Sequence, residues 1–103
     1  MPVVELHAFT RVERLEAVAR VRFAVSGAGG WITGHQQFSN VSLCVQFEID
    51  GSSLPELGRV LREAGILLAR EAEAVAGSVA CSLQITFLSG EPDLRTPPPA
   101  VPG

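Results

Sequence analysis

A chain of 103 residues with a formal net charge of −3 has room for one small domain and carries no basic surface suited to nucleic-acid phosphates. All eight basic residues are Arg, and both Lys and Tyr are absent, which excludes lysine Schiff bases, a P-loop lysine and a phenolic acid. There is no apolar run of the length of a membrane helix, no signal-peptide pattern, and no disulfide framework from only two Cys. We therefore expect a cytoplasmic protein.

Residues 3–9 alternate apolar and polar side chains, which predicts a half-buried strand. Two interpretations of residues 10–19 stay open. Thr10 and Glu13 have the spacing of a helix capping box, whereas the apolar alternation within the same segment also fits the far half of a hairpin. Residues 20–26 continue that alternation and predict a second strand.

Residues 41–49 form the clearest predicted strand, with apolar side chains on one face and polar side chains on the other. A helix is predicted from a second capping box, Ser53 with Glu56, and its apolar side chains recur at helical spacing. Gly65 interrupts this helix. Either the helix tolerates the glycine at about 1 kcal/mol, or it ends there in a glycine cap and a strand follows. The apolar stripe favours continuation to Ala76.

The alternation of apolar and polar side chains in residues 78–88 predicts the last strand. Residues 1–90 then make a single α+β domain, and residues 91–103 make a Pro-rich, mobile C-terminal tail. The expected fold is a two-layer sandwich, with a mainly antiparallel sheet of about four strands and one or two helices on one face. If residues 10–19 are helical, the element order is βαββαβ, and a ferredoxin-like arrangement follows.

The two cysteines are predicted on opposite faces of the sheet, Cys44 on the polar face and Cys81 on the apolar face. They should therefore form neither a disulfide nor a shared metal site. His7 also points to the polar face, so a Cys44–His7 pair requires only that their strands be neighbours. The side chains expected on the polar face are Glu5, His7, Arg20, Arg22, Ser42, Cys44, Gln46, Glu48, Ser82, Gln84 and Thr86.

The segment 27–40, GAGGWITGHQQFSN, contains four glycines and the only Trp of the chain. As a loop it is long for a connection between strands, and its large apolar side chains should pack against something. In a second interpretation, residues 27–30 form a tight turn and an extended arm follows, with a bulge at Gly34. Trp31, Thr33, His35 and Gln37 would then share one face of the arm.

From these features we expect a small non-catalytic binding or regulatory module that is a homodimer and contacts a small polar ligand or its partner subunit. No metal, cofactor, nucleic acid or membrane is expected. The alternative is a small enzyme with His35 or His7 as acid–base and Cys44, Glu48 or Asp50 assisting. The residues expected to bind the ligand are Trp31, His35, Gln36, Gln37 and Asn40.

Overall fold

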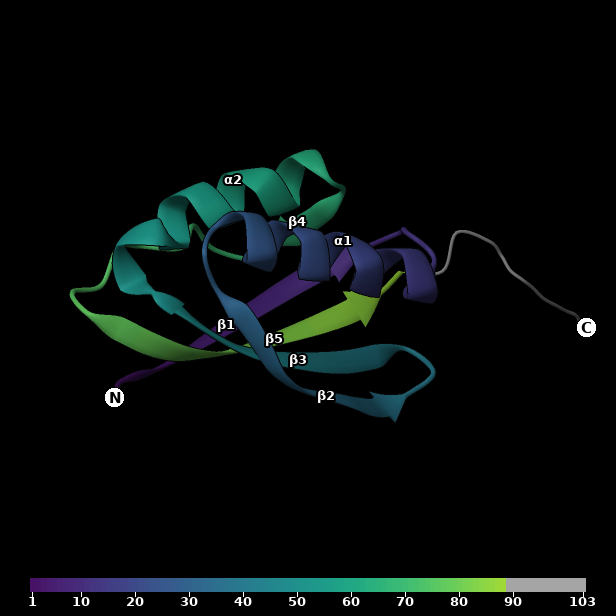
Figure 1. Ribbon diagram of the computed structural model, residues 1–103. Helices are drawn as coiled ribbons and strands as arrows, with labels where there is room; N and C mark the ends of the chain where they lie inside the picture. The colour runs from purple at the N-terminus through teal and green to yellow at the C-terminus, as the bar shows by residue number, and fades with distance from the viewer. Residues whose placement is uncertain (89–103) are drawn as a thin grey trace, which may run out of the picture.

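The computed structural model describes residues 1–88 and shows one five-stranded sheet covered on one face by two helices (Figure 1). The two-layer α+β prediction is confirmed, with five strands in place of about four. The predicted tail, 91–103, lies outside the described residues. The elements are β1 (Val3–Thr10), α1 (Arg14–Gly27), β2 (Trp31–Ser39), β3 (Ser42–Asp50), the 3-10 turn η1 (Gly51–Ser53), α2 (Leu54–Glu63), β4 (Ile66–Leu68) and β5 (Ser78–Phe87).

The sheet has the spatial order β2-β3-β5-β1-β4. β1 pairs in parallel with β5 along the whole length of β1. Every other neighbouring pair of strands is antiparallel. The chain follows the order βαββαβ with the short strand β4 inserted before the last strand. In the split β-α-β unit of a ferredoxin-like domain, one strand separates the two strands that a helix connects. Here both β5 and β3 separate β1 from β2, so the ferredoxin-like arrangement is not confirmed.

Of the two interpretations of residues 10–19, the helical one is observed from Arg14 onward, and the predicted strand 20–26 is wrong because α1 continues through it to Gly27. Its buried side chains are Ala17, Val21, Ala24 and Val25, which have helical spacing and face the sheet. The sequence misleads here because the other face of α1 is also rich in apolar residues, so that alternate positions are apolar as well. A 14-residue helix also supplies the length that a connection across a sheet requires.

The start of α1 differs from the predicted Thr10–Glu13 capping box. Glu13 itself is the N-cap, and its carboxylate accepts hydrogen bonds from the backbone N–H groups of Leu15 and Glu16. These bonds hold the pKa of Glu13 below its ordinary value. Thr10 is buried, and its hydroxyl donates to the carbonyl oxygen of Gly65 at 2.7 Å. Thr10 therefore joins β1 to the end of α2.

The helix α2 ends at Glu63, so the predicted continuation to Ala76 is wrong and the glycine-cap alternative is the observed one. Gly65 has a φ of +86°, which favours glycine, and β4 begins directly after it. Ile66 is fully buried and pairs with β1, which outweighs the helical propensity of the residues that follow. The predicted Ser53–Glu56 box is also wrong, since Ser53 makes no side-chain capping bond.

The apolar faces predicted for the third and last strands are confirmed, and they form the core beneath the helices. Burial of the apolar side chains of β3 and β5 against α1 and α2 is the main contribution to the stability of the fold. No helix within residues 1–88 has both the length and the apolar character needed to cross a membrane. The fully or nearly fully buried side chains of these two strands are Leu43, Val45, Phe47, Ile49, Val79, Cys81, Leu83 and Ile85.

Gly51 joins the connection between β4 and β5 to the end of β3. Its N–H donates to the carbonyl of Gly77 at 2.8 Å, and its carbonyl accepts from the N–H of Val75 at 3.0 Å. A Cβ at position 51 would lie 2.1 Å from the carbonyl oxygen of Val75, which is backbone and must shift as a whole.

We predict that Gly51→Ala lowers the free energy of unfolding by about 1–3 kcal/mol, the usual range for an overpacked site. Gly27→Ala is the matched control, because a Cβ there meets nothing within 4 Å and lies at the end of a helix. That variant should keep or slightly raise the stability. Urea unfolding of both variants makes the comparison, and equal stabilities would contradict the close approach at Gly51.

Candidate functional site

The glycine-rich segment is a turn followed by a strand, as in the extended-arm interpretation. Gly29 has a φ of +86° in the turn, and β2 then runs along one edge of the sheet, paired only with β3. Gly30 lies so close to β3 that a Cβ would be 2.6 Å from the carbonyl oxygen of Glu48. Gly29 and Gly30 are therefore needed for the backbone geometry of the turn.

A β-bulge in β2 decides which side chains share a face. Ile32 lies across from Phe47 and Gly34 lies across from Gln46, so Thr33 is an extra residue in the strand. The extra residue reverses the alternation, which places Trp31 and His35 on opposite faces of the sheet. The bulge was expected near Gly34, but the shared face of Trp31 and His35 was predicted wrongly.

The five predicted ligand-binding residues are consequently divided. Trp31 and Gln36 lie on the face of the sheet that the helices leave uncovered, across from Glu48 and Cys44. His35 and Gln37 lie on the helix side, across from the buried residues Val45 and Leu43. Asn40 is in the turn between β2 and β3. The predicted set of Trp31, His35, Gln36, Gln37 and Asn40 is therefore not one site.

Asn40 contributes through its backbone. Its carbonyl oxygen accepts a hydrogen bond from the guanidinium of Arg14, at the start of α1. The same guanidinium lies 5.4 Å from the centre of the Phe87 ring, within the range of a cation–π contact. Arg14 thus holds the tip of the β2–β3 hairpin against α1 and the end of β5, which is a structural role.

We call the uncovered side of the sheet the open face. The register brings its side chains into four long rows that run across the strands and a short fifth row of Asp50 and Ser78, and the polar face predicted from the sequence is confirmed except for Arg20 and Arg22, which are in α1. The rows are Trp31, Glu48, Ala80 and Val3; Gly34, Gln46, Ser82 and Glu5; Gln36, Cys44, Gln84 and His7; and Ser39, Ser42, Thr86, Phe9 and Leu67.

Small side chains and neutral hydrogen bonds occupy the centre of the open face. The thiol of Cys44 lies 3.1 Å from the hydroxyl of Ser82, and the amide of Gln84 donates to the hydroxyl of Ser42 at 3.2 Å. Cys44 is only 5% exposed, although it is on the uncovered side, because neighbouring side chains close over it. The centre is therefore uncharged.

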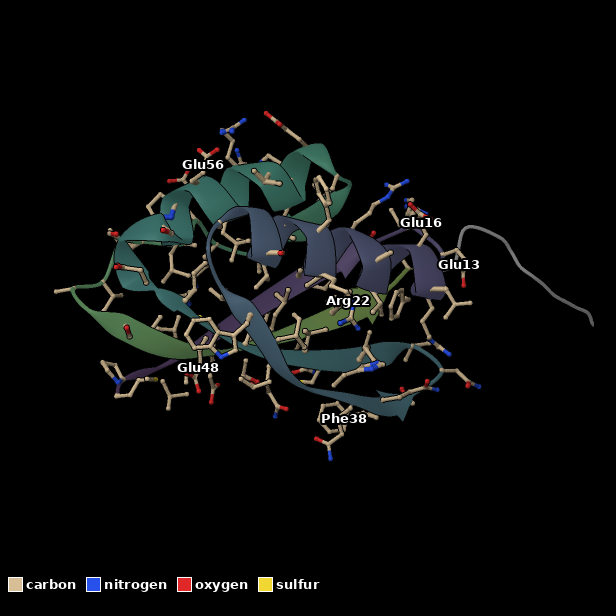
Figure 2. The ribbon with its side chains drawn as sticks, viewed as in Figure 1. Glu13, Glu16, Arg22, Phe38, Glu48 and Glu56 are labelled. Atoms are coloured by element: carbon tan, nitrogen blue, oxygen red, sulfur yellow. The ribbon has the colours of Figure 1, made fainter. Side chains whose placement is uncertain are left out.

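Aromatic side chains lie at the margins of the open face. Trp31 and Phe38 on β2 are each 57% exposed, and Phe9 on β1 is 41% exposed. Figure 2 shows Phe38 and Glu48 projecting on the side of the sheet away from the helices. The carboxylates of the rows are Glu5, Glu48 and, at the end of β3, Asp50. A five-stranded face with so few charges and such exposed aromatics differs from an ordinary solvated face.

The proposed enzymatic residues do not converge. Gln84 lies between Cys44 and His7, so the two are separated by two strand spacings, roughly 10 Å, which is too far for a hydrogen bond. Asp50 accepts hydrogen bonds from the backbone and hydroxyl of Ser52, which hold its pKa below the ordinary value. Cys81 faces the core, as predicted. Within residues 1–88, no group of three or more potential metal ligands is close enough to hold an ion.

A hollow of about 510 Å³ was not predicted from the sequence. It lies beside the first half of β1, because β4 pairs only with the second half and the chain then leaves the edge. Its polar lining comes from Glu5 and His7 on β1 and from the charged residues of segment 70–73. In the sequence, only the short apolar run of β4 indicates the edge strand that borders this hollow.

Comparison with protein-family models, with curated proteins and with solved structures gives no match for this chain. A function for it therefore has to be inferred from the placement of its own residues.

Burial raises the pKa of the Cys81 thiol from 9.0 to about 11, since the thiolate is poorly solvated in the core. The unfolded chain releases this proton near pH 9, whereas the folded chain keeps it to about pH 11. In that window the unfolded state binds fewer protons, so the free energy of unfolding should fall as the pH rises. The absence of Lys and Tyr leaves few other groups that titrate there.

We predict that Cys81→Ala flattens this alkaline fall in stability. Cys44→Ala, the control from the open face, should retain it. Urea unfolding at several pH values between about 9 and 11 makes the measurement. A Cys81→Ala variant with an unchanged slope would show that the buried thiol is not its cause.

Proposed function

We propose that this chain is a small non-catalytic interaction module that acts as a homo-oligomer and binds a partner through the open face of its sheet. The carrying observation is the composition of that face, which combines exposed aromatic margins with an almost uncharged centre. Depletion of charged residues and enrichment of aromatic residues are the marks that distinguish an interface core from the remaining surface.

The shape of the open face favours a protein surface over a small polar ligand. Small molecules bind in concave sites that enclose most of their surface, whereas the hollows of this domain meet the open face only at its margins, at Trp31 on one side and at Glu5 and His7 on the other. Ala80 and Ser82 are short, partly exposed side chains on the central strand β5, so a second surface can approach the sheet closely there. Trp31 offers a flat apolar contact, and Gln36 offers hydrogen bonds of fixed direction.

The edge of β2 supports the same proposal. This strand pairs on one side only, and no charged residue or proline occurs between Trp31 and Ser39. Natural edge strands usually carry such residues to prevent unwanted pairing. However, register shifts near Thr33 and Phe38 interrupt the regular pairing of β2, so a second strand could not pair with it evenly. Side-chain contacts on the open face are therefore the better candidate for the main contact with the partner.

We also propose that the protein works in the cytoplasm. Cys44 and Cys81 are both free and lie on opposite faces of the sheet, so they cannot form a disulfide with each other. This arrangement suits a reducing compartment.

The binding role of the open face can be tested in cells without knowing the partner. A photo-crosslinking amino acid at Gln36 should give a defined adduct, because Gln36 is exposed on the open face beside Cys44. The same probe at Glu56 is the matched control, since Glu56 projects from α2 away from the sheet (Figure 2). The mass of the adduct separates a second copy, another protein and a small ligand.

Gln84→Lys should abolish the adduct at Gln36. The lysine can reach water while the face is free, but covering it would bury an unpaired charge at a penalty of several kcal/mol. Equal cross-linking from Gln36 and Glu56, or an adduct that persists in Gln84→Lys, would contradict a binding role for the open face.

A further inference from the structure

The first half of β1 is a strand edge without a neighbour. β4 pairs only with residues 8–10 of β1, and the N–H of Ala69 then donates to the carbonyl of His7 at 2.8 Å. After Ala69 the chain leaves this edge, and the next backbone hydrogen bond of the connection joins Val75 to the end of β3. Within the part of the chain that the structure describes, nothing pairs with residues 3–6 on this side of β1.

The pairing on the two sides of β1 identifies the backbone groups that are free. The bond from Ala69 to His7 shows that odd-numbered residues of β1 direct their N–H and carbonyl groups toward this edge. The carbonyl of Thr10 accepts a bond on the β5 side, as expected for an even-numbered residue. Val3 and Glu5 therefore keep two N–H groups and two carbonyls without a backbone partner. They lie roughly 7 Å apart, the two-residue repeat at which an added strand forms its hydrogen bonds.

The hollow of about 510 Å³ lies along this free edge, and its size is in the range of ligand sites, roughly 300–1,000 Å³. Residues 70–73 and Val75 line the hollow without pairing with β1. Val4 and Leu6, which pack against the core on the helix side, supply part of its apolar lining. An added strand would find free backbone groups beside it and apolar side chains for one of its faces.

The charged lining of this hollow is acidic. It contains three carboxylates, those of Glu5, Glu71 and Glu73, and one guanidinium, that of Arg70. Among residues 1–88, none of these carboxylates takes part in an ion pair. A bound segment with basic side chains would therefore meet opposite charges that no other residue of the domain neutralises.

We infer that the free half of β1 binds, by strand addition, an extended segment of a partner protein in which basic and apolar side chains alternate. The bound segment continues the line of β4, exchanges backbone hydrogen bonds with Val3 and Glu5, and places its basic side chains among the carboxylates. Charge selects this occupant over a second copy, because a second copy would bring the same acidic lining to the edge. This inference does not depend on the homo-oligomer or on binding through the open face.

Peptide binding to the intact chain tests this edge. The probe is a fluorescein-labelled Val-Arg-Val-Arg-Val peptide with blocked ends, and Val-Glu-Val-Glu-Val is its control. At low salt the basic peptide should bind at least about tenfold more tightly than the acidic one, and added salt should reduce this preference. Amide hydrogen exchange should slow at Val3 and Glu5 on binding and stay unchanged in β2, at the opposite edge of the sheet.

Two sets of variants separate the backbone contribution from the charge contribution. Glu5→Pro removes an outward N–H and leaves the bonds to β5 in place, so it should weaken binding of the basic peptide at least about tenfold. Glu5→Gln is the matched control, which loses the charge but keeps the N–H, and it should weaken binding less. The double variant E71R/E73R changes exposed residues outside the strands and should reverse the preference between the two peptides.

Thermal unfolding verifies that each variant is folded, and the E71R/E73R comparison decides the question even where Glu5→Pro does not fold. Absence of binding up to about 1 mM, equal affinity for the two peptides, or slowed exchange in β2 overturns the inference. Self-association of the chain that Glu5→Pro abolishes would assign the edge to a second copy and overturn the partner segment. The cross-linking result at Gln36 reports separately on the open face.

Discussion

The parallel pairing of β1 with β5 is the constraint on which the rest of this structure depends. It places β5, the last strand within residues 1–88, in the middle of the sheet, between β1 and β3. The chain must therefore cross two strands to go from β1 to β2, and two strands to go from β3 to β4. The helices α1 and α2 make these crossings on the same side (Figure 1). The apolar faces of the central strands are buried beneath them, and the opposite face stays open across its width.

Strands with strict alternation could be predicted from the sequence, because one face is buried and the other is not. The apolar residues of β3 and β5 occupy the predicted face, and so do the polar residues that form the centre of the open face. The neighbours of each strand could not be predicted. The Cys44–His7 pair failed for that reason alone: both side chains are on the expected face, but β5 lies between their strands.

The errors occur where local patterns fit two structures equally well. Residues 15–25 are apolar at alternate positions and also at helical positions, and only the need to cross the sheet selects the helix. Gly65 is compatible with a helix interior and with a helix end, and the pairing of Ile66 with β1 decides between them. In β2, the single extra residue Thr33 sends Trp31 and His35 to opposite faces, which divides a site that looked continuous in the sequence.

The open face and the exposed apolar side chains of α1 lie on opposite layers of the domain. α1 belongs to the helical layer, and the open face belongs to the far side of the sheet. Because both helices cross the sheet on the same side, the polar side chains of β3 and β5 stay accessible from the other side. An association through the open face would therefore leave the helical layer uncovered.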